Sequence, residues 1–491
     1  MVIESMKKYQ EIEKKVLENR PLIRDFIVRI GESKYSDSIE EVEEIYYTHP
    51  EGLYTKGKNE LKKDVRFHSI ALIENRKHVK FYGHAIQRAI EDTYELGGGK
   101  VVLIGSASAE NPNIYYSGAL NLKSGVELYI EQNAVLRFIR NKSNEYYPLV
   151  FSRWEGVDLI NFSPMIYAYE AKNIKISGKG VIDGGADEYN WMPWKYGYFH
   201  EKNQKIERDK LFKQCKDDVK PYLRIYNDKV STFRPCLIQP YLCSEIEISD
   251  VKIVNSPFWE INPVLCENVY IHDVYIASKL YNNDGVDPEC CKDVIIERCY
   301  FLTGDDCIAI KSGRNDDGRS IGIPSENIII RNNEFKDGHG GITIGSEISG
   351  GVKNIYAHDN LFDSPELDYP IRFKNNAERG GIIEDIYIYN STIRKSKISI
   401  VHADFYYEEG TNGKYKPVLR NVYIDNVKSQ NNVDSEAKYA IFLRGFSDSP
   451  IENIYLKNFD IYGIEQISFV ENSNNIFFEE IYIDSNKIDK L

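Results

Sequence analysis

A phrase of a polar pair followed by alternating apolar residues recurs through the second half of this 491-residue chain. Glu267-Asn268-Val269-Tyr270-Ile271 and Glu326-Asn327-Ile328-Ile329-Ile330 are two copies. Such alternation is typical of a β-strand. Repeats of this length, built around a short strand and without helical periodicity, predict a right-handed parallel β-helix in which each coil rests on the previous one. The first apolar residues lie 22 to 36 residues apart, at Ile246, Val269, Val294, Ile328, Ile355, Ile386, Val422, Ile454 and Ile476.

The position before these apolar residues is Asn or Asp in every copy from residue 267 onward. Asn and Asp tolerate left-handed backbone conformations and form local hydrogen bonds at turns. We therefore expect a stacked row of turns along the solenoid. Its members are Asn268, Asp293, Asn327, Asn354, Asp385, Asn421, Asn453 and Asn475.

The N-terminal part of the chain has a different pattern. Residues 1–75 are charge-rich, have helical character in stretches such as Ser38 to Ile45, and contain no copy of the phrase. They are predicted to form a partly helical N-terminal extension of unassigned role. The predicted fold class is all-β, with residues 76–491 forming one parallel β-helix catalytic domain.

Residues from His84 to Leu96 predict one amphipathic helix, which Gly97-Gly98-Gly99 ends. An uncovered solenoid end exposes apolar core and an unpaired strand edge, so a helix here is expected to cap the first coil. The expected apolar face consists of Ala85, Ile86, Ala89, Ile90 and Tyr94.

Two interruptions of the repeat are predicted to border a binding face. Residues 184–233 hold Trp191, Trp194 and a lysine-rich run, and residues 404–413 begin with Asp404-Phe405-Tyr406-Tyr407. Long insertions in solenoids emerge as loops on one face, often the binding face. For the first insertion, an aromatic surface loop without a binding role is an equal alternative.

Composition excludes several function classes. The net charge of −13 argues against a nucleic-acid partner, and no apolar run is long enough to span a membrane. The residues after Met1 form no signal peptide, so we expect a cytoplasmic location. The eight cysteines lack paired metal-binding spacing, which predicts free thiols and no metal or other cofactor. The sequence is compatible with a monomer and with a homo-oligomer.

Four short motifs follow one another on successive coils: Asn282-Asn283-Asp284-Gly285, Gly304-Asp305-Asp306, Gly338-His339-Gly340 and Arg372-Phe373-Lys374. One residue of each motif lies 11 to 17 residues after the first apolar residue of its coil, namely Asp284, Asp306, His339 and Arg372. This common phase predicts that the side chains line one edge of the solenoid. Together they supply the groups needed to hydrolyse a glycosidic bond next to an acidic sugar.

Inverting hydrolysis requires one carboxylic acid that protonates the leaving oxygen and one carboxylate that activates water. If the chain bends at Gly304, Asp305 and Asp306 can both face the cleft with Asp284. Repulsion within this trio should retain one proton near neutral pH. A polar turn and a calcium site are the alternatives. For inversion we expect roughly 6.5–9.5 Å between the acid and at least one of the other two carboxylates.

Because the protein as a whole is negatively charged, binding an anionic substrate requires positive side chains at the binding site. A solvated charged face is the alternative for such a cluster of cations. The candidates are Lys311, Arg314, Arg319, Lys353, Arg372, Lys374 and Arg379.

The four motifs resemble those of glycoside hydrolase family 28, the polygalacturonases and their relatives. The resemblance covers roughly residues 85–459 and is densest from Asn255-Ser256-Pro257-Phe258-Trp259 to Lys374. It implies a right-handed β-helix, an inverting mechanism without a metal, and a pectic oligosaccharide or polygalacturonate as substrate. Gly304 and Asn283 depart from the Gln and Thr that many members carry. Both positions border the cleft, so the resemblance does not specify which sugars the individual subsites of this protein prefer.

The resemblance also implies roles for individual residues. Asp305 would be the general acid, and Asp284 with Asp306 would position and deprotonate water. His339 would tune the acid. Substrate binding would involve Asn282, Arg372, Lys374 and Glu347, the cations holding the galacturonate carboxylate and Glu347 contacting a sugar hydroxyl.

The two insertions and the stretch Gly345-Ser346-Glu347 favour exo-type members, which trim oligogalacturonides from one end. Three alternatives remain: a hydrolase of rhamnogalacturonan or xylogalacturonan linkages, a calcium-dependent enzyme similar to pectate lyases, and a non-catalytic β-helix that binds polysaccharide.

Overall fold

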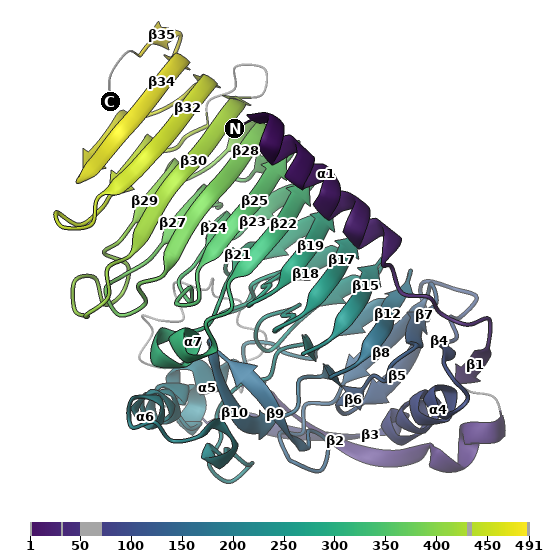
Figure 1. Ribbon diagram of the computed structural model, residues 1–491. Coiled ribbons are helices and arrows are strands. Elements are labelled where there is room, and N and C mark those ends of the chain that lie inside the picture. Colours follow the sequence, from purple (N-terminus) through teal and green to yellow (C-terminus); the bar gives the residue numbers. More distant parts are fainter. Residues whose placement is uncertain (1, 31–32, 50–70, 430–434, 489–491) are drawn as a thin grey trace. The chain divides into compact units, whose positions relative to one another are not determined.

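The computed structural model describes residues 2–30, 33–49, 71–429 and 435–488. Short parallel strands dominate the described residues (Figure 1). Contacts divide the chain into two compact units. The C-terminal unit comprises Met1–Arg20, Pro263–Ile276 and Asp284–Leu491, and the N-terminal unit comprises Pro21–Asn262 and Ala277–Asn283.

The C-terminal unit consists of coils whose strands pair in parallel with those of the next coil. One layer contains β17 (Glu267–His272), β19 (Lys292–Glu297), β20 (Tyr300–Thr303), β22 (Ser325–Arg331), β23 (Glu334–Asp337), β25 (Val352–His358), β26 (Leu361–Asp363), β28 (Ile382–Lys395), β30 (Val418–Ser429), β32 (Ile451–Ile461), β34 (Ser473–Ile483) and the short antiparallel β35 (Asn486–Lys487). A second, six-stranded sheet contains β21 (Ile308–Ile310), β24 (Gly340–Ile344), β27 (Tyr369–Lys374), β29 (Ser399–Asp404), β31 (Tyr439–Arg444) and β33 (Gln466–Glu471).

The observed register confirms the predicted repeat. From β17 to β34, each first apolar residue of the phrase pairs with the next, beginning with Val269 opposite Val294 and ending with Ile454 opposite Ile476. Apart from Ile476, which is partly exposed, these residues are buried because every second side chain of a strand faces the solenoid interior. One sequence position therefore forms one row along the core.

The predicted row of turns is also confirmed. All eight Asn and Asp residues have positive φ angles, from 54° to 61°. Asn327 donates to Asp293 at 2.8 Å, and Asn354 donates to Asn327 at 3.1 Å. Five amides of the row, including these two, bond to the equivalent side chain on the previous coil, so the row also ties neighbouring coils together.

Helix α1 (Val2–Glu18) lies across the strands of the C-terminal unit (Figure 1). Its Ile12 and Val16 pack against Tyr270, Ile295 and Ile329 of β17, β19 and β22. The same unit contains the short helix α7 (Asn315–Ile321). Part of the predicted extension, residues 1–75, thus contributes to this core, whereas residues 31–32 and 50–70 lie outside the described residues.

The N-terminal unit is a second stack of parallel strands with several helices. Its strands are β1 (Ile27–Ile30), β2 (Glu40–Thr48), β3 (Ile73–Phe81), β4 (Gly99–Leu103), β5 (Asn113–Ser117), β6 (Leu120–Asn121), β7 (Val126–Ile130), β8 (Ala134–Phe138), β9 (Leu149–Trp154), β10 (Val157–Phe162), β11 (Ile166–Tyr169), β12 (Lys172–Gly178), β13 (Val181–Asp183), β14 (Ile238–Tyr241), β15 (Ser244–Ser249) and β16 (Lys252–Val254); β18 (Tyr275–Ser278) lies where the chain returns to it. The helices are η1 (Ser33–Ser38), α4 (Gly83–Glu95), α5 (Pro193–Tyr196), η2 (Tyr198–His200), α6 (Gln204–Lys216) and η3 (Pro221–Leu223).

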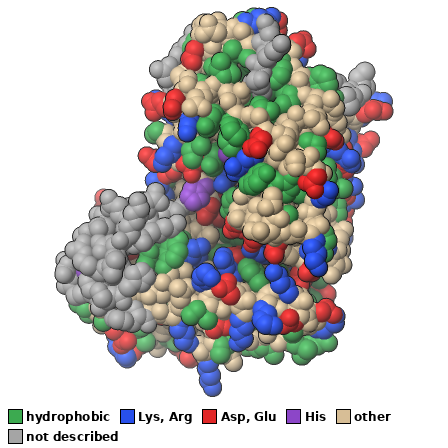
Figure 2. Space-filling view, turned by 90° about the vertical axis from the view of Figure 1, so that its left-hand side faces the viewer, with side chains coloured by type: hydrophobic (Ala, Val, Ile, Leu, Met, Phe, Trp, Pro, Cys, Tyr) green, Lys and Arg blue, Asp and Glu red, His purple; other side chains and the backbone are tan. Residues whose placement is uncertain are grey.

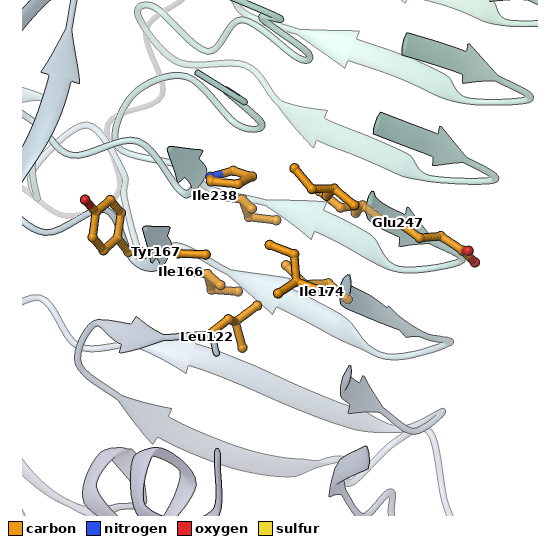
Figure 3. A pocket seen from close by; sticks show the side chains of 11 residues that line it. Leu122, Ile166, Tyr167, Ile174, Ile238 and Glu247 are labelled. Atoms are coloured by element: carbon orange, nitrogen blue, oxygen red, sulfur yellow. The ribbon is translucent and has the colours of Figure 1, made fainter. Parts of the chain in front are cut away.

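The interior of this stack is filled with aliphatic side chains. In Figure 3, Leu122, Ile166, Ile174 and Ile238 point toward one another, whereas Glu247 points away. The space left between them is about 10 Å³, the lower limit for one water molecule. The solenoid core is therefore packed and offers no room for a ligand at this level.

The predicted capping helix is confirmed as α4, which packs on β4, β5 and β7. Its apolar face needs one correction, because Tyr94 is 49% exposed and Thr93 is buried instead. Thr93 lies seven residues after Ile86 and thus continues the stripe of Ile86, Ala89 and Ile90.

The helical interpretation of the stretch from Ser38 to Ile45 is wrong, because Glu40–Thr48 forms β2. It pairs antiparallel with β3 along its whole length, from Glu40 opposite Phe81 to Thr48 opposite Ile73. Strand pairing with a distant segment thus overrides the helix propensity of a glutamate-rich sequence.

Candidate active site

Three aspartates converge in the C-terminal unit. Asp284, Asp305 and Asp306 each place one carboxylate oxygen within 4.8 Å of the others. Asp305 and Asp306 occupy the turn between β20 and β21, and the Gly285 N–H donates to the Asp306 carbonyl at 3.0 Å. The backbone of neighbouring coils therefore brings the first two motifs together, as their common phase predicts.

The third motif lies on the following coil. The His339 N–H donates to the Asp305 carbonyl at 3.0 Å, and its ring Nδ1 lies 2.9 Å from Asp305 Oδ1. At Gly340, a Cβ atom would lie 2.7 Å from Asp306 Oδ1. Only glycine at this position leaves room for the Asp306 carboxylate, which explains why His339 is followed by Gly.

Asp306 is fully buried between two cations. Lys374 Nζ lies 2.5 Å from Asp306 Oδ2, and an Arg372 guanidinium nitrogen lies 3.3 Å from Oδ1. Burial alone would raise the pKa of Asp306, but the charges of Lys374 and Arg372 outweigh it and lower this pKa. Asp306 is therefore ionised in the folded protein.

The pKa of Asp284 is shifted in the opposite direction to that of Asp306. Burial, together with the charge of Asp305, raises the pKa of Asp284 to about 7, although Lys311 opposes the shift from 3.5 Å. The charges of Asp305 and Asp306 both contribute to this shift, so the protonation of Asp284 depends on the other two carboxylates. The trio therefore retains one proton up to nearly neutral pH.

Asp305 is the most accessible member of the trio. Its side chain is 20% exposed, compared with 0% for Asp306, and the neighbouring His339 is 42% exposed. Only an accessible carboxyl group can contact a leaving oxygen, so the geometry favours Asp305 as the proton donor.

The expected separation of acid and base is wrong for this structure. The nearest oxygens lie within 4.8 Å of one another instead of at roughly 6.5–9.5 Å. The reason is that Lys311, Arg372 and Lys374 bind the carboxylates and offset their mutual repulsion.

The two cations of the fourth motif lie under aromatic rings. The Arg372 guanidinium lies 4.4 Å from the ring centre of Tyr369, and Lys374 Nζ lies 5.1 Å from that of Tyr407. The Tyr407 ring also lies 5.5 Å from the Arg372 guanidinium. Tyr407 was not among the predicted site residues, although it belongs to the predicted insertion 404–413.

Glu347 lies beside the trio but is engaged in ion pairs. Its carboxylate lies 3.4 Å from Lys311 and 3.2 Å from Arg314. Burial alone would raise the pKa of Glu347, but Lys311, Arg314 and Arg379 together lower it. Its contact with a sugar hydroxyl remains a prediction, and the structure shows it holding the cations around the trio.

Asn282 belongs to the N-terminal unit. Its Oδ1 accepts hydrogen bonds from Lys195 at 2.5 Å and from Arg234 at 2.8 Å, and its φ angle is 56°. Lys195 lies in the predicted insertion 184–233, which folds into helices and aromatic clusters. The sugar-binding role of Asn282 remains a prediction.

The seven predicted cations separate into two groups. Lys311, Arg314, Arg372, Lys374 and Arg379 surround the trio or its neighbours, mostly buried. Arg319 pairs with Asp316, and Lys353 pairs with Glu326 on the other layer of strands. On the face that Figure 2 shows, basic and acidic side chains are interspersed. What distinguishes the site is that its cations are buried and paired with buried carboxylates such as Asp306 and Glu347.

A metal ion could be held where three or more His, Cys, Asp or Glu side chains lie close together. Among the described residues, the trio is the group that meets this condition. A calcium ion there would compete with the ammonium group of Lys374 for the oxygens of Asp306. This competition argues against the calcium alternative. Within the described part of the chain, no helix is long and apolar enough to cross a membrane.

Comparison with known proteins gives a consistent result. Residues 151–478 match the family described as "Glycosyl hydrolases family 28". An exopolygalacturonase from Thermotoga maritima of known structure is 31% identical, with a TM-score of 0.78 and 96% of both chains covered. A polygalacturonase structure from Erwinia carotovora is 21% identical with a TM-score of 0.58, which supports the fold.

Two curated relatives have lower identity. A "Probable polygalacturonase" from Vitis vinifera is 26% identical over 364 residues, which cover 71% of this chain and 65% of that protein. An "Exo-poly-alpha-D-galacturonosidase" from Dickeya chrysanthemi is 26% identical over 397 residues, which cover 74% and 63%. The chain thus spans less than two thirds of the length of either relative.

Proposed function

The chain belongs to glycosyl hydrolase family 28, and we propose that it hydrolyses α-1,4-galacturonosidic bonds in polygalacturonate and pectic oligosaccharides. The observation that carries this proposal is the buried trio of aspartates next to two cations, Arg372 and Lys374. The trio supplies acid and base, and the cations supply the charge that an acidic sugar requires.

Asp305 acts as the general acid. It is the accessible member of a trio that retains a proton, and His339 holds its carboxyl group from 2.9 Å. The His339 contact fixes the direction in which Asp305 faces the leaving oxygen. The bond to the leaving sugar breaks as Asp305 donates its proton.

Asp306, assisted by Asp284, acts as the base. A nucleophile that forms a covalent sugar intermediate must contact the anomeric carbon, but Asp306 has no exposed surface. In the proposed step the attacking water contacts the trio through Asp284, whose side chain is 5% exposed, and the negative charge of Asp306, which Lys374 and Arg372 keep ionised, draws the proton of the water into the trio. A single attack by water inverts the anomeric configuration, despite the short distance between the carboxylates.

Arg372 and Lys374 recognise the substrate carboxylate. The chain carries a net charge of −13, so long-range attraction does not draw the substrate to the site. A charge-assisted contact in a water-poor site is worth more than an exposed ion pair, and both side chains are largely buried. The Tyr407 ring, which contacts both cations, forms one wall of this subsite.

The substrate is attacked from one end. Support comes from the Thermotoga maritima exopolygalacturonase, which is similar over 96% of its chain, and from the folded segment 404–413 beside the cations. Internal cleavage would require an open groove on both sides of the trio.

Time-resolved product analysis on polygalacturonate and defined oligogalacturonides tests this function. We expect saturated products, released from one end at an unchanged rate in the presence of a chelator. Unsaturated products that absorb in the ultraviolet and disappear with chelator would establish a lyase instead. Cleavage of only rhamnogalacturonan or xylogalacturonan would overturn the substrate, and binding without cleavage would overturn the catalytic role.

A further inference from the structure

Lys311 is a buried cation on the coil that carries Asp306. Its side chain is 3% exposed, and its Nζ lies 3.5 Å from Asp284, 3.9 Å from Asp287 and 3.4 Å from Glu347. All three of these acidic side chains are buried. One ammonium group therefore joins the trio to two further acidic residues.

The backbone of Lys311 is tied to the neighbouring coils. Its N–H donates to the Pro288 carbonyl at 2.9 Å, and its carbonyl accepts from the Cys290 N–H at 3.0 Å and from the Ser325 hydroxyl at 2.6 Å. Glu289 lies opposite Lys311 in the strand register. Because the strand is bound by the coils on both sides of it, the root of the Lys311 side chain is fixed relative to the trio.

Glu347 is held so that it faces the ammonium group. Its Oε2 lies 3.4 Å from Lys311, while its Oε1 accepts from Arg314 at 3.2 Å and from the Ser346 hydroxyl at 3.2 Å. Its carbonyl accepts from the Ser312 N–H at 2.6 Å, which joins the segments that follow β21 and β24. Both carboxylate oxygens of Glu347 thus contact groups of the protein, and a sugar hydroxyl would have to compete with two cations for them.

The groups around Lys311 keep its ammonium group charged. Burial alone would lower the pKa of Lys311, but Asp287, Glu347 and Asp284 together raise it, and Asp306 adds to their effect. Burial and the charge of Asp284 raise the pKa of Asp287 well above its ordinary value, which favours the neutral form of Asp287. Glu347 and Asp284 are therefore the two anions that compete most directly for Lys311.

Asp284 in turn faces charges of both signs. Burial, Asp305 and Asp306 raise the pKa of Asp284, whereas Lys311 and Lys374 lower it. Of the two cations, Lys311 has the larger effect. A change in the charge next to Lys311 should therefore reach the proton that the trio shares.

We propose that Lys311 is the positioning residue of Asp284, and that Glu347 acts on catalysis through Lys311 and not through a sugar hydroxyl. This inference rests on the proposed function. Lys311 holds the carboxylate that contacts the attacking water and stabilises its charged form. Glu347 shares the ammonium group with Asp284, so it limits how strongly Lys311 acts on the trio.

The test removes the two charges one at a time and follows kcat/KM of trigalacturonide across pH. Lys311→Met takes a cation away from Asp284, so the trio should keep its proton longer and the alkaline limb should move up by ~1 pH unit or more. Glu347→Gln leaves the ammonium group to Asp284, so the same limb should move down while KM changes little. A purely structural role would not shift the limb in opposite directions.

The matched controls are Lys292→Met and Glu326→Gln. These two residues form an ion pair at 3.0 Å on the other layer of strands, so their removal makes the same changes of charge away from the trio. The alkaline limb of both controls should coincide with that of the wild-type protein. Glu347→Gln preserves the size of the side chain, which keeps the test valid if Lys311→Met does not fold.

A folded Glu347→Gln protein with a raised KM and an unmoved alkaline limb would overturn the proposal, because Glu347 would then contact the sugar. An unmoved limb in folded Lys311→Met, or shifts of both variants in the same direction, would overturn it as well. A wild-type protein that does not cleave trigalacturonide would instead refute the proposed function, before any variant is compared.

Discussion

Lys374 Nζ lies 2.5 Å from Asp306 Oδ2, and both side chains are buried. The lysine assigned to the substrate carboxylate is therefore also the main counter-charge of the proposed base. One side chain thus links substrate recognition with catalysis.

Lys374→Met should impair the base. Lys374 lowers the pKa of Asp306, so its removal raises this pKa, and the acidic limb of the kcat/KM profile should move to higher pH. We expect kcat to fall at least ~10-fold, since a positioned acid or base contributes ~10²–10⁴. Kinetics on trigalacturonide across pH check this, with Lys353→Met as the control, because Lys353 pairs with Glu326 away from the site. An unchanged acidic limb would separate Lys374 from the base.

Asp305→Asn should abolish proton donation while leaving the fold and substrate binding intact. The amide keeps the shape of the carboxyl group, so we expect kcat to fall at least ~10²-fold with little change in affinity. Steady-state kinetics and equilibrium binding of trigalacturonide measure the two effects. Asp359→Asn is the control, because the Asp359 side chain is 47% exposed and pairs with His358 of β25, away from the trio. Turnover near the wild-type value would remove Asp305 from the role of acid.

Activity should be lost as pH rises through the titration of the trio. Burial and the Asp305 charge raise the pKa of Asp284 to about 7, so the shared proton is present below this pH and lost above it. The kcat/KM profile on trigalacturonide, which reports the pKa values of the free enzyme, should therefore decline on the alkaline side from about this value. A profile that stays flat well above it would mean that the acid is not part of the coupled trio.

The helix α1 should contribute to stability and not to catalysis. Ile12 is buried against Tyr270, Ile295 and Ile329, so Ile12→Ala should lower the free energy of unfolding by about 2–5 kcal/mol. Denaturant unfolding measures this, and kcat should not change. Lys14→Ala on the same helix is the control, because the Lys14 side chain is 72% exposed. Equal effects of the two variants would show that α1 does not pack as described.

The solenoid could be predicted from sequence because its register is repeated in the sequence itself. The anchors Val269, Val294 and Ile328 pair as the repeat requires, and Asn327 and Asn354 form the expected row of turns. Local periodicity and turn chemistry are sufficient for this. The convergence of the motifs around Asp305 follows from the same register.

Other features depended on contacts between distant residues. Glu40–Thr48 forms a strand only because Ile73–Phe81 pairs with it. The close spacing of the carboxylates depends on Lys311 and Lys374, whose side-chain positions no periodicity specifies. Tyr407 belongs to a segment recognised as an insertion, but its place over Lys374 depends on the ion pairs of Glu408 and Glu409 with Arg379.

The central claim is that the trio hydrolyses galacturonosidic bonds by one attack of water. Proton NMR of the first products formed from trigalacturonide tests it most directly. The account predicts saturated products whose new reducing end is initially the β-anomer, the inverted configuration. A first-formed α-anomer would show that a carboxylate attacks as a nucleophile, and an unsaturated product would show that the bond is broken by elimination.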